Sequence, residues 1–181
     1  MGYHESLTEG RNAVLEAFRS GKTVDRLFVL DGCQDGPVKT ILREAKKQDT
    51  MVQYVKKERL DQLSETKNHQ GVIAYCAACE YAEVSDILEN AKKKGEAPFI
   101  VLLDGIEDPH NLGAIIRTAN QAGAHGVIIP KRRAVGLTAT VAKTSAGAIN
   151  YTPVAKVTNI SKTIDCLLYT SDAADDLIGV D

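Results

Sequence analysis

Residues 104–113 form a polar segment between two apolar runs, where an expected strand ends and an expected helix begins. Asn111 can cap a helix that begins there, and Gly113 in its first turn would let a ligand or another backbone approach closely. Arg117 follows six residues after Asn111. Because the N–H groups and dipole of a helix N-terminus favour an anion, the segment predicts an anion-binding site. The alternative is an ordinary capped helix on which Arg117 forms a surface ion pair with Glu107 or Asp108.

A second group of cations follows another apolar run. Lys131, Arg132 and Arg133 are adjacent in a loop, where their charges repel one another. They could bind phosphates, and the alternative is a solvated turn. Lys143 opens a run of small residues, 143–147, that resembles a phosphate-binding turn but lacks the spacing of a P-loop.

Other reactive side chains carry weaker signals. His110 could contact an anion, although a single loop histidine is more often solvent-exposed. Cys76 and Cys79 have CxxC spacing, but no second pair of cysteines or histidines completes a zinc site. We therefore expect no metal site.

The elements that must position these residues alternate between helical and strand-like patterns, which predicts an α/β fold. Residues 1–76 form a small α/β domain. Residues 77–96 form a linker helix or a short lead-in, mostly charged with one apolar stripe, that ends in a charged run. From residue 97, an apolar strand, an amphipathic helix and a second apolar strand make a βαβ unit within about 32 residues. This unit predicts a parallel sheet whose ligand site lies at the carboxyl ends of its strands.

Composition narrows the class of protein. The 181 residues include 22 basic and 24 acidic residues and four cysteines. No apolar run approaches the roughly 20 residues that cross a bilayer, and no signal peptide is recognisable, so a cytoplasmic protein is expected. The acidity is concentrated at the end: residues 1–165 carry a net charge of +2, whereas residues 166–181 hold four acids and no base.

Several motifs resemble one known family. Residues 103–119 are similar to the first signature of the SpoU (TrmH-type) RNA ribose 2'-O-methyltransferases, and Asn111, Gly113 and Arg117 match its N-x-G-x-x-x-R core. Residues 10–15, 69–74 and 143–148 also resemble that family, in the right order. Together they look most like the branch that methylates a guanosine of bacterial large-subunit ribosomal RNA.

The resemblance implies an RNA-recruiting domain followed by an α/β-knot (SPOUT) methyltransferase domain, which acts as a homodimer. S-adenosylmethionine (AdoMet) would donate a methyl group to a ribose 2'-hydroxyl. Asn111 and Arg117 would be catalytic, with Arg117 either a general base or, less demandingly, a bidentate phosphate clamp oriented by Asn111. The residues expected to bind RNA are Arg11, Asn12, Lys131, Arg132, Arg133 and Lys143, with His69 and Gln70 as further candidates.

The chain departs from the family pattern after Asp165. The two later signatures, which form the AdoMet pocket and tie the knot, are absent, so residues 97–165 are expected to be an incomplete methyltransferase domain. Residues 166–181 resemble translated sequencing-adapter sequence and are expected to be a non-native tail, with a divergent natural tail as the alternative. The expected function is AdoMet-dependent 2'-O-methylation of RNA. The alternatives are a non-catalytic RNA-binding module and, less well supported without a G-x-G-x-x-G motif, a nucleotide-binding protein.

Overall fold

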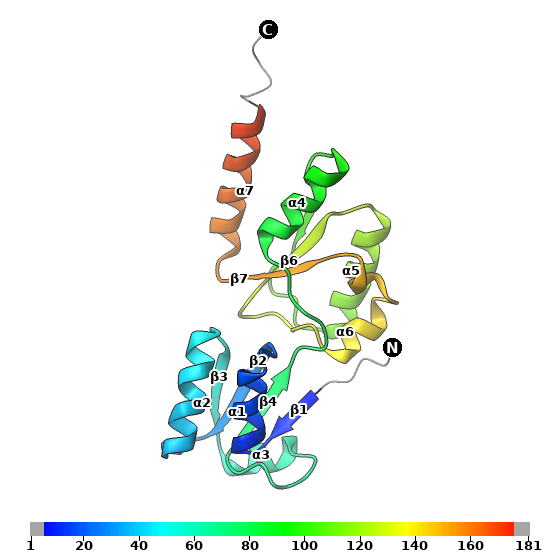
Figure 1. Ribbon diagram of the computed structural model, residues 1–181. Helices are drawn as coiled ribbons and strands as arrows, with labels where there is room; N and C mark the ends of the chain where they lie inside the picture. The colour runs from blue at the N-terminus through cyan, green and yellow to red at the C-terminus, as the bar shows by residue number, and fades with distance from the viewer. Residues whose placement is uncertain (1–5, 176–181) are drawn as a thin grey trace. The chain divides into compact units, whose positions relative to one another are not determined.

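The computed structural model describes residues 6–175 (Figure 1). These residues belong to two compact units. The first unit contains the chain up to Glu80 together with residues 136–146, and the second contains residues 81–135 and the chain from 147 onward. This division differs from the expected boundaries, which placed a linker at 77–96 and all of residues 97–165 in one domain.

The first unit is built on a mixed four-stranded sheet in the order β1-β4-β2-β3, with β2 and β3 parallel and the other neighbours antiparallel. Its strands are β1 (Ser6–Glu9), β2 (Val24–Leu30), β3 (Met51–Val55) and β4 (Val72–Cys76). Its helices are α1 (Arg11–Arg19), α2 (Gly36–Lys47), α3 (Lys57–Leu63) and α6 (Ala139–Thr144).

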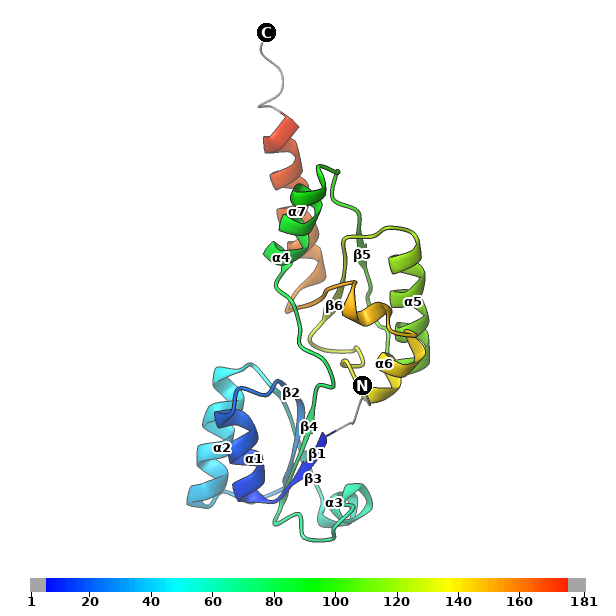
Figure 2. The same ribbon diagram turned by 45° about the vertical axis from the view of Figure 1, so that its right-hand side comes forward.

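Side-chain alternation along β2 explains the layers of this unit. Leu27 and Val29 are fully buried in a cluster with α1 and α2, whereas Phe28 points to the other face and packs with Leu60 of α3. Successive strand residues face opposite sides of a sheet, so one strand serves both cores. Figure 2 shows α1 and α2 on one side of the sheet and α3 on the other.

The second unit contains a parallel three-stranded sheet in the order β5-β6-β7. Its elements are α4 (Val84–Lys94), β5 (Ile100–Leu102), α5 (Pro109–Gln121), β6 (Gly126–Pro130), the 3-10 helix η1 (Ala148–Asn150), β7 (Val154–Val157) and α7 (Ile160–Asp175). The α/β class, the βαβ unit and the parallel sheet predicted from the sequence are confirmed.

Helices cover both faces of this sheet: α5 lies on one face, and α4 and α7 lie on the other (Figure 2). Ile128 of β6 packs against Ile87 of α4, and Gly126 of β6 lies so close to Ile87 that an added Cβ would come within 2.6 Å of its side chain. The segment expected to be a linker therefore contains a helix of the second unit, because its apolar stripe is buried on β6.

α7 continues past Asp165, the residue after which a non-native tail is expected. Within residues 6–175, no helix is long and apolar enough to cross a membrane.

Candidate functional site

Two loops of the second unit meet at the carboxyl edge of the parallel sheet. The loop after β5 leads into α5, and the loop after β6 begins with Lys131. The Val135 N–H donates to the Ile106 carbonyl at 2.8 Å, which ties the two loops together. The structure thus places the predicted anion-binding segment and the cations after β6 at one edge, as expected for loops that follow neighbouring parallel strands.

The N-terminus of α5 is capped differently from the sequence prediction. Asp108, not Asn111, is the N-cap: its carboxylate accepts the backbone N–H groups of His110 at 3.3 Å and Asn111 at 3.1 Å. Pro109 then occupies the first turn, where its fixed φ suits a helix and its missing N–H costs nothing. Because a carboxylate already accepts from these two donors and offsets the helix dipole, the terminus offers an anion fewer free N–H groups than the sequence predicted.

Arg117 is exposed on the middle of α5. In the described part of the chain, its guanidinium forms no hydrogen bond or ion pair, so the expected alternative of an ion pair with Glu107 or Asp108 is not present. Six helical residues separate it from Asn111, which corresponds to about 9 Å along the axis and roughly 120° around it. Asn111 is also exposed and does not contact Arg117, so the structure does not contain the contact in which Asn111 would orient the guanidinium.

The predicted cations lie in both units. Arg132 and Arg133 are exposed, and Arg133 has a φ of 57°, a conformation that side-chain-bearing residues rarely adopt. The Lys131 N–H donates to the Val157 carbonyl and continues the pairing of β6 with β7. Lys143 is exposed on α6, which belongs to the first unit.

In the first unit, the two family-like motifs come together. Arg11, the first residue of α1, donates from its backbone N–H to the Gln70 side chain at 3.1 Å and from Nε to the Gln70 carbonyl at 3.1 Å. Its Nη2 also lies 2.6 Å from Asp35. Gln70 and the neighbouring Gly71 both have positive φ angles, which forms a tight turn beside α1. Asn12 follows Arg11 and is exposed.

His69, a further RNA-binding candidate, is buried with 7% of its surface exposed. Its Nδ1 accepts the Gly71 N–H at 3.0 Å, and its Nε2 lies 3.0 Å from Asp61. Because Nδ1 is an acceptor, the proton is on Nε2 and points at the carboxylate. The imidazole therefore holds the turn in place and is not available to a ligand.

Sequence reasoning missed Glu9, which organises the loop before His69. Its carboxylate accepts hydrogen bonds from the Ser64 hydroxyl, the Glu65 and Thr66 N–H groups and the Thr66 hydroxyl. Burial alone would raise the pKa of Glu9, but these hydrogen bonds stabilise the charged form and lower the pKa below its ordinary value. Its role depends on a loop 55 residues away, a pairing for which the sequence contains no signal.

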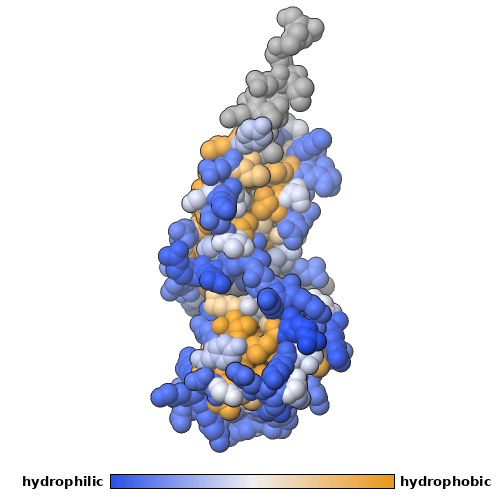
Figure 3. Space-filling model, turned by 90° about the vertical axis from the view of Figure 1, so that its left-hand side faces the viewer, coloured by the Kyte–Doolittle hydropathy of each residue, from blue (hydrophilic) through white to orange (hydrophobic). Residues whose placement is uncertain are grey.

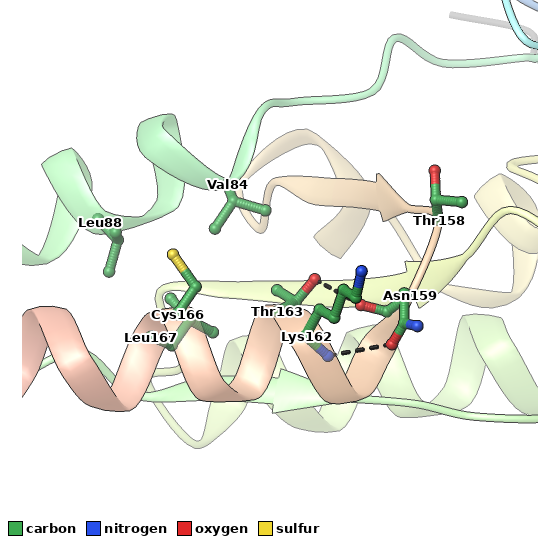
Figure 4. Close-up of a pocket in the computed structure, with 8 residues that line it drawn as sticks. All are labelled: Val84, Leu88, Thr158, Asn159, Lys162, Thr163, Cys166 and Leu167. Carbon is green, nitrogen blue, oxygen red and sulfur yellow. Dashed lines mark hydrogen bonds between the residues drawn. The ribbon is translucent and has the colours of Figure 1, made fainter.

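A groove of about 420 Å³ lies between α4 and α7. Figure 4 shows Val84 and Leu88 of α4 opposite Cys166 and Leu167 of α7. The remaining lining residues are Thr158, Asn159, Lys162 and Thr163, of which Asn159 accepts from the Lys162 N–H at 3.0 Å. Apolar side chains also form patches elsewhere on the surface (Figure 3). Among residues 6–175, no group of His, Cys, Asp or Glu side chains could hold a metal ion.

Two protein-family models match the chain. One, described as RNA 2'-O ribose methyltransferase substrate binding, matches residues 7–82. The other, described as the SpoU rRNA Methylase family, matches residues 98–170.

Curated relatives are similar over most of the chain. "Putative TrmH family tRNA/rRNA methyltransferase YacO" of Bacillus subtilis is 50% identical over 156 residues, which cover 86% of this chain and 62% of the relative. The "Putative TrmH family tRNA/rRNA methyltransferase" of Staphylococcus epidermidis has the same identity and coverage. The chain thus spans about three fifths of the length of these relatives.

Among solved structures, the SpoU methyltransferase AviRb from Streptomyces viridochromogenes in complex with AdoMet matches with a TM-score of 0.45 and 22% identity. The match covers 93% of this chain and 60% of that one.

Proposed function

Since the chain belongs to the SpoU (TrmH-type) family of RNA methyltransferases, we propose that it functions in the 2'-O-methylation of ribose in RNA. The observation that carries the proposal is the succession of two family matches, substrate binding over residues 7–82 and methylase over residues 98–170. The RNA substrate we propose is large-subunit ribosomal RNA, with a guanosine as the methylated nucleotide.

Arg117 is the residue we propose to act at the reacting ribose. A 2'-hydroxyl is a poor nucleophile, so the adjacent phosphate must be held where the hydroxyl oxygen can approach the methyl group in line. A charged guanidinium offers five donors and no acceptor, which suits a bidentate phosphate clamp better than a general base. The exposure of Arg117 and its lack of an internal partner in residues 6–175 support this role. We propose that Asn111, on another side of α5, contacts the substrate separately.

The first unit would recruit the RNA through the turn at which Arg11, Asn12 and Gln70 meet. Arg11 is already paired with Asp35, but its side chain remains 32% exposed. A phosphate could therefore share the guanidinium, and the exposed Asn12 amide could both donate to and accept from the RNA. In the second unit, Lys131, Arg132 and Arg133 would hold phosphates near the reacting nucleotide. Lys143 on α6 would add a further phosphate contact.

AdoMet is the methyl donor that the proposed reaction requires. The groove between α4 and α7 does not fit it, because no acidic side chain lines this groove to bind the cofactor's ammonium group or ribose hydroxyls. No step of the mechanism is therefore assigned to that groove. We infer that the AdoMet pocket depends on sequence that the longer relatives have in addition.

We further propose a cytoplasmic homodimer as the working form. The family model that matches residues 98–170 is described as an rRNA methylase, and the proposed location rests on that substrate.

A second candidate function is an RNA-binding module without catalysis. The observation that favours it is the α4–α7 groove, which offers AdoMet no acidic partner. This function requires only the first unit and the cations of the second.

One experiment separates the two candidates. The 181-residue chain and its Arg117→Ala variant are incubated with ribosomal RNA and methyl-labelled AdoMet, and RNA binding is measured in parallel. Methyl label that reaches a ribose hydroxyl with the wild-type chain, but not with the variant, supports the enzyme. AdoMet binding is measured as well, and a chain that binds RNA but neither binds AdoMet nor transfers the label supports the module. A chain that neither binds nor methylates RNA contradicts both.

A further inference from the structure

The outward face of α2 carries three cations in a row. Lys39, Arg43 and Lys46 are spaced by four and three residues, so at 100° per residue they lie within about 60° of one another on the helix surface. The buried residues of the helix, Val38, Ile41 and Ala45, lie on the opposite face. All three cations are exposed.

The stability of α2 does not account for this arrangement. In the part of the chain that the structure describes, none of the three side chains forms an ion pair or hydrogen bond, whereas the neighbouring Lys47 pairs with Glu44 at 2.7 Å. Like charges one turn apart repel each other. Lys39 also lies near the N-terminus of α2, where the helix dipole disfavours a cation. A bound polyanion would relieve both penalties.

An exposed aromatic ring lies on the same side of the sheet. Tyr54 is 57% exposed on β3, which is one of the two edge strands of its sheet. It is paired in register with Val29, whose side chain is buried in the cluster that contains α2. Residues paired across neighbouring strands point to the same face, so Tyr54 projects on the side that α2 covers. Figure 1 shows α2 and β3 next to each other.

We propose that Lys39, Arg43, Lys46 and Tyr54 form a second RNA-binding surface, the α2 surface, which holds RNA away from the nucleotide that is methylated. This inference rests on the proposed function. The three cations would bind consecutive phosphates without reading sequence, and the Tyr54 ring would stack on an unpaired base. Charge complementarity selects the occupant: a row of unpaired cations beside an exposed aromatic ring fits single-stranded RNA.

The cations are tested by the salt dependence of RNA binding. A Lys39→Gln/Arg43→Gln/Lys46→Gln variant of the 181-residue chain is compared with a Lys92→Gln/Lys93→Gln/Lys94→Gln variant, which loses the same charge from exposed lysines of α4. Binding of a labelled single-stranded ribosomal RNA fragment is followed by fluorescence anisotropy at several salt concentrations. The plot of log K against log salt has a negative slope. We expect this slope to become less steep by about 2 in the α2 variant and to stay unchanged in the α4 variant.

The aromatic ring is tested separately. Tyr54→Leu should weaken RNA binding about tenfold, whereas Tyr54→Phe, which keeps the ring, should retain wild-type affinity. Thermal melting followed by circular dichroism verifies that each variant is folded.

Each outcome is informative. Equal slopes for the α2 variant and the wild type, or equal losses in the α2 and α4 variants, overturn the α2 surface while leaving the proposed function intact. Binding of polyglutamate is measured with the same variants. If the α2 variant loses polyglutamate binding but keeps RNA binding, the surface binds an acidic protein and the α2 surface is overturned as an RNA site. A wild-type chain that binds no RNA even at low salt contradicts the proposed function and this inference together.

Discussion

At the scale of single residues, the polar and charged groups around the Gln70 turn of the first unit are held by hydrogen bonds and ion pairs. The Arg117 side chain of the second unit has no such partner within residues 6–175. Arg11, Glu9 and His69 are each held by at least two partners, which for Arg11 and Glu9 come from distant parts of the sequence. They fix the turn around Gln70 in advance of any ligand. Since a preorganised surface loses less entropy on binding, we interpret these contacts as support for the RNA-recruiting role that we propose for the first unit.

Glu9 predicts an acid-dependent loss of stability. Its pKa in the folded protein is below the ordinary value of 4.5, so the charged carboxylate stabilises the fold above that pH. The contribution is lost as the pH falls from about 4.5 through the lower folded pKa. Glu9→Gln should therefore be less stable than wild type at pH 7, and the two urea midpoints should converge in acid. Glu16→Gln, at an exposed position of α1, is the control that should match wild type throughout.

Gly126 predicts a packing defect. A Cβ there would lie 2.6 Å from Cδ1 and Cγ1 of Ile87, so Gly126→Ala should reduce the free energy of unfolding by about 1–3 kcal/mol. Gly36→Ala is the matched control, because nothing lies within 4 Å of that position. Chemical denaturation measures both. If the two variants were equally stable, α4 would not be packed on β6 as described.

At the scale of elements, the sequence pattern predicted types of element better than their ends and partners. The βαβ unit predicted from residue 97 is present as β5, α5 and β6, because continuous apolar runs and helical apolar spacing are local patterns. The prediction that Asn111 caps α5 was wrong. Both Asp108 and Asn111 are good capping residues, and Pro109 decides between them because proline favours the first helical turn. The apolar stripe of α4 indicated a buried face, but the surface that it packs on could not be predicted, since that depends on the glycine of β6 that faces Ile87.

The cap of α5 gives a direct test at this scale. Asp108→Ala should cost about 1 kcal/mol of stability, because two backbone N–H groups lose their acceptor. Asn111→Ala should cost little, since its side chain caps nothing in the described structure. Thermal denaturation of both variants measures the difference. A larger loss in Asn111→Ala would restore the original prediction that Asn111 is the cap.

At the scale of the whole molecule, the candidate site could be predicted only as motifs. The sequence predicted a ligand site at the carboxyl ends of parallel strands, and the structure brings the loop that leads into α5 and the cations after β6 to one such edge, because parallel strands align their carboxyl ends. It did not predict that residues 136–146, with Lys143, belong to the first unit, since that assignment rests on long-range contacts such as the Ala78 N–H to the Leu137 carbonyl at 2.7 Å.

The central claim is that this chain binds RNA, which both proposed functions require. The most direct measurement is the affinity of the 181-residue chain for ribosomal RNA over a range of salt concentrations. We predict that log K falls linearly with log salt, by about 0.7 to 0.9 per phosphate neutralised. An affinity that does not change with salt, or no binding at low salt, would contradict the account.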